Sequence, residues 1–234
     1  MTLAMTRAGT EPKIADDAAW PGLPVELDAI ERWRPVSAPI DPWLTLRLCR
    51  YRRRETVPAP IWEAARAMAA RADALVSVQT LIRLTRVAVA RPDSVRLAAG
   101  AVFSGRAIGA LLGGCPLAVA FVLTLGPRLE AEATALAERR DLLEAFLLET
   151  AGWAALETAV RALRLDLVAR ARSRHWRVTH RLAPGYLDWP IEEQRALMGL
   201  FGDADGLVRL SEHGVLVPMK SVTGVFGLAP ARSG

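Results

Sequence analysis

The sequence contains almost no lysine. Only Lys13 and Lys220 are lysines, so 28 of the 30 basic residues are arginines, against 25 acidic residues. The formal net charge of +5 suits a protein that binds a polyanion, but a chain this rich in arginine and alanine is also typical of a GC-rich genome. The charge alone therefore assigns no partner.

Cysteine and histidine are also scarce. The two cysteines, Cys49 and Cys115, show no C-x-x-C spacing, and the three histidines show no spacing typical of metal ligands. These absences argue against a disulfide scaffold and a zinc ribbon, and we expect no metal site. Without a His–Asp or Cys–His arrangement we assign no catalytic residue. Cys115 stands in an apolar stretch and is expected to be a small buried side chain.

An unbroken apolar segment of membrane-spanning length is missing too. Residues 107–127 carry no charge, but glycines and Pro116 interrupt them in the middle. This pattern favours a buried helix, a turn and a buried strand over a spanning helix. The sequence also shows no apolar run typical of a secretory signal. We therefore expect a cytoplasmic protein without a membrane partner.

The length and composition predict one large domain with an N-terminal appendage. The chain has 234 residues, of which 52% are hydrophobic, so it can bury a substantial core. Residues 1–35 show no sustained periodicity, and we expect them to form a mobile extension. Ordered structure is expected from about Ile40, and residues 36–234 are interpreted as a single domain.

Helical and strand patterns mix without regular βαβ alternation. Helices are predicted at 41–50, 61–75, 106–112 and 128–172, the last broken at 139–141. A further helix is predicted to begin at Pro190, with Asp188 or Trp189 as its cap and with Glu192 and Glu193 complementing its positive end. Strands are predicted as two within 74–89 and one each at 94–99, 117–125 and 177–181, followed by a hairpin over 207–217 and a last strand at 221–226. Together they indicate an α+β fold with a twisted, largely antiparallel sheet flanked by helices.

Chemistry-bearing residues gather in one loop and in a strand that follows it. Residues 181–194 read RLAPGYLDWPIEEQ, and residues 217–227 read VPMKSVTGVFG. This pair resembles the activation (reactivation) domain of cobalamin-dependent methionine synthase, which carries R-x-[SA]-P-G-Y and P-x-K-S-V-[ST]-G. Weaker likenesses at 46–52 and 110–130 extend the resemblance over roughly residues 38–228. The loop resembles the short, stand-alone members most.

The resemblance implies a site for S-adenosylmethionine (SAM) in residues 36–234. Arg181 would pair its guanidinium with the methionine carboxylate, a geometry that lysine cannot copy. Ala183 would offer backbone groups to the ligand, Pro184 and Gly185 would form the tight turn, and Tyr186 would line the pocket.

An acidic residue and a glycine complete what the resemblance implies. Glu157 stands where the family carries an acid that faces the positive end of the ligand. Gly214 departs from methionine synthase, which has a tyrosine at that point of the hairpin, so the side chain beside the methyl donor is missing here.

Each of these residues also has a purely structural interpretation. Tyr186 and Trp189 would pack the loop on the sheet, Glu157 would be a solvated residue at the edge of an apolar helical face, and Lys220 would be a solvated strand residue. The resemblance favours function for Arg181, Ala183 and Tyr186. It leaves Glu157 and Lys220 open.

The function that the resemblance implies is reductive reactivation. SAM would be held against cobalamin carried by a partner, either a corrinoid protein or methionine synthase, while a flavodoxin or ferredoxin-type protein supplies an electron. Whether the chain is itself an enzyme or a methyl-transfer component stays open. Two alternatives also remain: a SAM-using enzyme that acts on a small molecule without cobalamin, and a non-catalytic basic binding module. The Arg-rich segment 161–181 motivates the second alternative, although no nucleic-acid-binding motif accompanies it.

Overall fold

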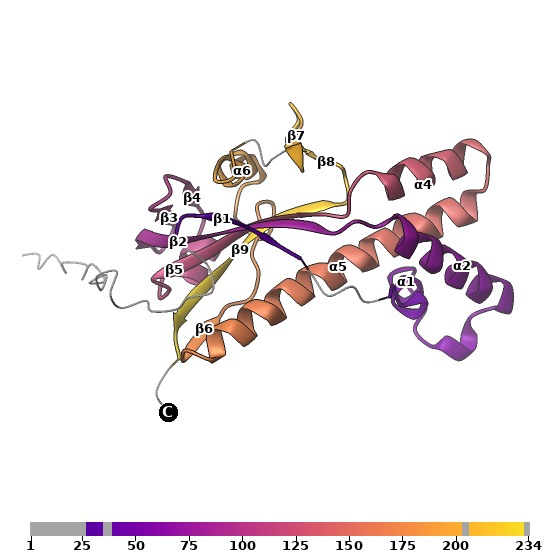
Figure 1. Cartoon of the computed structure of the whole chain (residues 1–234), viewed down its shortest axis with the longest axis horizontal. Helices are drawn as coiled ribbons and strands as arrows, with labels where there is room; N and C mark the ends of the chain where they lie inside the picture. The colour runs from indigo at the N-terminus through magenta and orange to yellow at the C-terminus, as the bar shows by residue number, and fades with distance from the viewer. Residues whose placement is uncertain (1–26, 35–38, 203–205, 232–234) are drawn as a thin grey trace, which may run out of the picture.

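The computed structural model describes residues 27–34, 39–202 and 206–231. Its centre is an antiparallel sheet with the strand order β4–β3–β2–β5–β9–β6, and β1 pairs with β2 beside this path (Figure 1). The strands are β1 (Ile30–Trp33), β2 (Gln79–Arg91), β3 (Ser94–Leu97), β4 (Val102–Ser104), β5 (Leu117–Thr124), β6 (Trp176–Val178) and β9 (Ser221–Pro230). A separate hairpin joins β7 (Arg209–Leu210) and β8 (Leu216–Val217).

Helices cover both faces of the sheet and extend beyond it. They are α1 (Pro42–Leu48), α2 (Ala59–Leu75), α3 (Arg106–Leu112), α4 (Arg128–Glu138), α5 (Leu142–Arg172) and α6 (Gln194–Gly199), with short 3₁₀ turns at Arg54–Thr56 and Ile191–Glu193. The predicted α+β fold with a largely antiparallel sheet flanked by helices is confirmed.

The central strand β5 shows how the sequence builds two cores at once. All eight of its residues are buried, and side chains alternate between the two faces of a strand. Ala118, Ala120 and Val122 join the core beneath α3 and α6, whereas Val119 and Phe121 join the core beneath α5. Two-sided burial explains why this segment is an almost continuous apolar run.

The long helix α5 connects the sheet to a helical bundle. Its second half packs on the sheet through Leu156, Leu163 and Leu167. Its first half packs against α1, α2 and α4 in a third core that includes Leu148 and Ala151. Figure 1 shows α5 running beneath the sheet and out to these helices.

Several local predictions are confirmed. The predicted break at 139–141 separates α4 from α5, and α3 and β5 lie where the pattern placed them. Cys115 is buried, and burial raises the pKa of its thiol.

No helix within the described residues is long and apolar enough to cross a membrane.

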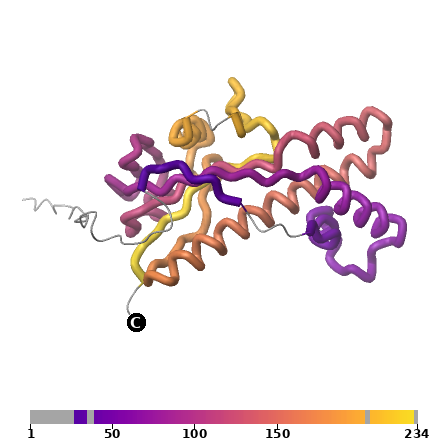
Figure 2. The backbone as a smooth tube through the Cα atoms, viewed as in Figure 1, coloured from indigo at the N-terminus to yellow at the C-terminus, as the bar shows by residue number. Residues whose placement is uncertain are grey.

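Other predictions are wrong. The two strands predicted within 74–89 are one strand, β2, because residues 79–86 pair without interruption with β5 and the register shift between Val87 and Val89 does not end the strand. Order does not begin at Ile40: β1, at residues 30–33, pairs with β2 and lies along the sheet in Figure 2. Residues 1–26 lie outside the described residues, so for them the mobile extension stays a prediction.

Candidate functional site

The loop that follows β6 runs along the edge of β9. Leu182 and Val225 form an isolated antiparallel bridge, with Leu182 N donating to Val225 O (3.1 Å) and Val225 N donating to Leu182 O (2.8 Å). Both side chains join the core beneath α3 and α6. Because neighbouring residues point to opposite faces, Arg181 faces the α5 side. Gly224 permits this approach, since a Cβ there would lie 2.9 Å from the Leu182 carbonyl oxygen.

A tight turn then carries the chain to Tyr186. Tyr186 N donates to Ala183 O (3.1 Å), and Gly185 takes a left-handed φ of +85°. Ala183 and Pro184 are buried, whereas Tyr186 is 55% exposed. The Arg181 guanidinium carbon lies 5.4 Å from the centroid of the Tyr186 ring. The turn therefore places a cation and an aromatic ring side by side.

Asp188 fixes the next part of the loop to a distant helix. Its carboxylate accepts hydrogen bonds from Arg106 N (2.8 Å) and Ala107 N (2.9 Å) at the start of α3. These backbone donors, that of Ala107 first, lower the pKa of the carboxyl group. The sequence predicted Asp188 or Trp189 as the cap of the helix that begins at Pro190, and this is wrong because the carboxylate caps α3 instead.

Trp189 and Glu193 complete the attachment. Trp189 is buried against Phe103, with ring centroids 4.9 Å apart, and its Nε1 donates to Glu193 Oε2 (2.8 Å). Glu193 also accepts from Ser104 N. Glu193 was predicted to complement a helix N-terminus, but its carboxylate bridges β4 and the loop. The structural interpretation of Trp189 is confirmed. We call residues 188–194 the clamp.

A cavity of about 380 Å³ lies between α5, β9 and the loop. Arg181 and Tyr186 line it from the loop, and Glu157 lines it from α5. Ala183, Pro184 and Gly185 are not among its lining residues; they form the turn that holds Tyr186. The remaining lining residues come from α5 and β9: Trp153, Leu156, Val160, Arg161, Arg164, Ser221, Val222 and Phe226.

The cavity combines unpaired charges of both signs with apolar walls. Within the described residues, neither Arg181 nor Glu157 makes a hydrogen bond or an ion pair with the protein. Arg164, in contrast, donates from Nε to Thr179 O (3.1 Å). A ligand with a carboxylate, a positive group and a flat apolar part fits such a set of side chains.

Lys220 lies next to this cavity, and of the two interpretations left open for it, the solvated strand residue is wrong. Its side chain is fully buried, and its ammonium forms an ion pair with Glu149 of α5. Its Nζ lies 4.5 Å from the centroid of the Trp153 ring. Lys220 stands directly before β9, and its side chain lies against Gly152 of α5.

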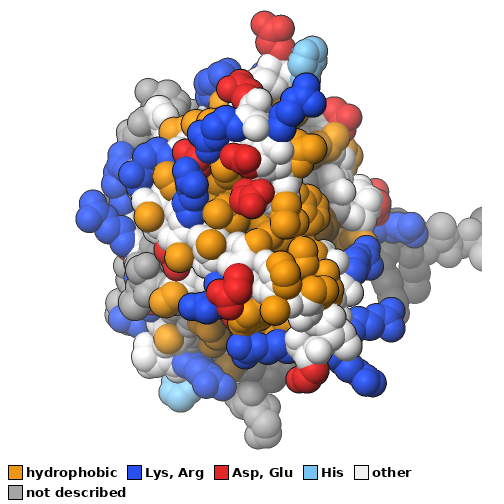
Figure 3. Space-filling view, turned by 90° about the vertical axis from the view of Figure 1, so that its right-hand side faces the viewer, with side chains coloured by type: hydrophobic (Ala, Val, Ile, Leu, Met, Phe, Trp, Pro, Cys, Tyr) orange, Lys and Arg blue, Asp and Glu red, His pale blue; other side chains and the backbone are white. Residues whose placement is uncertain are grey.

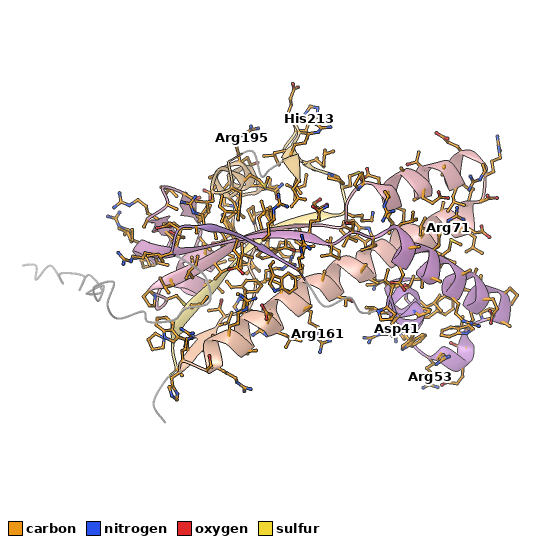
Figure 4. All side chains as sticks on the ribbon, in the orientation of Figure 1. Asp41, Arg53, Arg71, Arg161, Arg195 and His213 are labelled. Atoms are coloured by element: carbon orange, nitrogen blue, oxygen red, sulfur yellow. The ribbon has the colours of Figure 1, made fainter. Side chains whose placement is uncertain are left out.

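Apart from Glu157, the α5 wall of the cavity was not predicted from the sequence. Trp153, Glu157, Val160, Arg161 and Arg164 stand at positions i, i+4, i+7, i+8 and i+11, which lie on one face of a helix. In Figure 4 Arg161 lies on α5, on one side of the sheet, and Arg195 lies on α6, on the opposite side. The helical spacing was visible in the sequence, but the sequence did not show that the loop of residues 181–186 faces this side of α5. Within the described residues no cluster of three or more His, Cys, Asp or Glu could hold a metal.

Among protein families, curated proteins and solved structures, the chain is similar to a solved structure, through its fold. No protein-family model and no curated protein matches the chain. A solved structure, the crystal structure of the MetH reactivation domain bound to AdoHcy, matches with a TM-score of 0.60 and 13% identity, covering 94% of this chain and 85% of that one. At this identity the likeness establishes a shared fold, and AdoHcy is a ligand of that other protein.

Proposed function

We propose that the protein binds SAM in the cavity between α5, β9 and the loop. The observation that carries the proposal is the convergence of Arg181, Tyr186 and Glu157 on one cavity, although Glu157 is far from the other two in the sequence. The shared fold with a domain bound to AdoHcy supports it. The sequence resemblance in the loop points the same way.

The unpaired side chains match the ligand group by group. Arg181 would hold the methionine carboxylate through charge-assisted hydrogen bonds, which are stronger than neutral ones. Glu157 would face the positive end, either the ammonium or the sulfonium. Tyr186 would line the pocket beside Arg181, and the turn through Ala183, Pro184 and Gly185 would offer backbone groups at close range.

We infer that the bound SAM serves the reductive methylation of cobalamin on a partner protein. SAM supplies an electrophilic methyl group, and a flavodoxin or ferredoxin-type reductant supplies one electron, so that cob(II)alamin becomes methylcobalamin and S-adenosylhomocysteine remains. The protein contributes binding and orientation, which need no general acid or base. A role of this kind is compatible with a sequence in which no catalytic residue was assigned.

An arginine-rich connection between α1 and α2 suits an acidic partner. Arg50, Arg52 and Arg53 are exposed and make no ion pair within the described residues. Figure 3 looks onto this end of the molecule and shows basic side chains around hydrophobic ones. A second group of arginines lies at residues 170–177, at the end of α5 and the start of β6, and there Arg170 is already paired with Asp166 (2.8 Å) and Glu31 (3.5 Å). We therefore propose that the α1–α2 connection docks the corrinoid protein or the reductant.

A specific observation favours one alternative, a SAM-using enzyme that acts on a small molecule. The described residues of the β7–β8 hairpin contribute no side chain to the cavity, and the Gly214 carbonyl accepts from Gln194 Nε2 (2.9 Å) of α6. No side chain of this hairpin would stand between the bound SAM and a substrate other than cobalamin.

A methylation assay separates these two functions. The protein is mixed with SAM, cob(II)alamin and reduced flavodoxin, and the absorption spectrum is followed for methylcobalamin, with Arg181→Ala as the control. The proposed function predicts methylcobalamin in the wild-type reaction and its loss in the variant. SAM binding without methylcobalamin, both with free cob(II)alamin and with a corrinoid protein, would overturn the cobalamin role and favour the small-molecule enzyme.

A further inference from the structure

Lys220 is buried in a way that stability does not explain. Its side chain has no exposed surface, whereas the carboxylate side chain of Glu149, its partner, is 37% exposed. Lysine is almost never fully buried unless it is paired. Replacing a buried ion pair with apolar residues is often neutral or stabilising, so such a pair is weak evidence for a role in stability.

The fold makes room for this lysine at one point of α5. Gly152 lies where the Lys220 side chain passes: a Cβ there would lie 3.0 Å from Lys220 Cε and 2.9 Å from Leu129 Cδ2. A glycine inside a helix costs roughly 1 kcal/mol relative to alanine. At this position it allows the ammonium to cross the helix and reach the side that bears Glu149 and Trp153.

The ammonium ends against the indole of Trp153. Its distance of 4.5 Å from the ring centroid is within the range of a cation–π contact. Trp153 is 46% exposed and lines the cavity, so few apolar neighbours hold it in place. The ammonium thus has two partners, the indole of Trp153 and the carboxylate of Glu149, and such a contact would restrict the orientation of the indole at the cavity wall.

We propose that the Lys220–Glu149 ion pair positions Trp153 as the aromatic wall of the cavity, on which the adenine of the ligand packs. This inference rests on the proposed function, because SAM and S-adenosylhomocysteine both carry an adenine. Trp153 is the residue in contact with ligand, and Lys220 is a positioning residue that acts through it. Loss of either one should therefore weaken the same contact.

The first arm of the test needs no ligand. Acrylamide quenching of tryptophan fluorescence is measured for the wild type, Lys220→Met and Glu149→Gln, each against its Trp153→Leu counterpart, so that the difference reports Trp153. Arg71→Met, which breaks the ion pair between Arg71 and Glu132, is the matched control. We expect faster quenching of Trp153 in the Lys220 and Glu149 variants and no change in the control. Unchanged quenching in both variants overturns the positioning role.

The second arm measures the affinity for S-adenosylhomocysteine in a double-mutant cycle. Trp153→Leu and Lys220→Met should each weaken binding by about two- to tenfold, the range of an aromatic contact, and Lys220→Met should have no further effect once Trp153 is leucine. Independent losses overturn the proposal. If Lys220→Met does not fold, Glu149→Gln takes its place in the cycle. If the wild type binds no ligand, the proposed function fails, and the quenching arm alone decides whether Lys220 positions Trp153.

Discussion

Residues 181–186 and the clamp, residues 188–194, belong to one continuous loop, yet their side chains have opposite surroundings. Arg181 and Tyr186 are unpaired or exposed and line the cavity. Asp188, Trp189 and Glu193 are bound to β4 and α3 by hydrogen bonds and packing. A motif that looks uniform in the sequence thus divides into a part that lines the cavity and a part that fixes the loop to α3 and β4.

The different surroundings explain why residues 181–186 are followed by the clamp. A binding loop on the surface must be held within a fraction of an ångström to recognise a ligand. Here the clamp supplies that rigidity from the other face of the sheet, because Trp189 joins the core beneath α3 and α6. Substitutions in the clamp should therefore change stability, and substitutions in residues 181–186 should change affinity.

The largest effect is expected in the clamp. Trp189→Ala removes a fully buried indole and leaves a cavity, which should lower the free energy of unfolding by about 3–5 kcal/mol. Chemical denaturation of the wild type and the variant measures it. Trp62→Ala is a suitable reference, because Trp62 is only partly buried and contacts Arg54. Equal, small losses in both variants would contradict the role of the clamp.

The next largest effect is expected in residues 181–186. Arg181→Ala should weaken SAM binding by about 1.5–3 kcal/mol, since the carboxylate loses its charged partner, and should leave the free energy of unfolding unchanged. Calorimetric titration and thermal unfolding of the same samples measure both. Arg195→Ala on α6 is the control, an exposed arginine that does not line the cavity. Unaltered affinity in Arg181→Ala would remove this residue from the site.

A smaller effect is expected on the α5 side. Glu157→Gln keeps the shape of the side chain and removes its charge, which should weaken binding by about 0.2–1 kcal/mol, as for other partly exposed ion pairs. Titrations with SAM and with S-adenosylhomocysteine are compared. A larger loss for SAM indicates that Glu157 faces the sulfonium, and equal losses indicate the ammonium. No loss with either ligand would show that Glu157 is only a solvated residue.

The smallest effect is a pH dependence in the clamp. The backbone donors of α3 lower the pKa of Asp188 below its ordinary value of 3.8, so the folded state favours the ionised carboxylate. The stabilisation is present above pH 3.8 and is lost as the pH falls through the lowered pKa. Unfolding midpoints of the wild type and Asp188→Asn should thus differ at pH 7 and converge toward pH 3. A constant difference across that range would contradict this account.

Local patterns in the sequence predicted much of the fold. The break between α4 and α5 and the buried strand β5 follow from contiguous residues, and both were predicted. Strands β1 and β4 were missed because they have only four and three residues and depend on pairing with other strands. Short segments of this kind carry little signal of their own.

The candidate site was predictable only in part, for a similar reason. The loop resemblance identified Arg181 and Tyr186, but the partners of Asp188 lie about 80 residues away in α3. The role of Lys220 was left open, since lysine is rarely buried and its partner Glu149 precedes it by 71 residues. Contacts between distant segments decide such roles, and no local pattern records them.

Whether the cavity binds SAM is tested most directly by calorimetric titration of the purified protein with SAM, with S-adenosylhomocysteine measured in parallel. We expect saturable binding at one site in the wild type, strongly weakened in Arg181→Ala and retained in Arg195→Ala. Absence of binding at millimolar SAM, both alone and with a corrinoid protein present, would contradict the claim that this cavity is a SAM site.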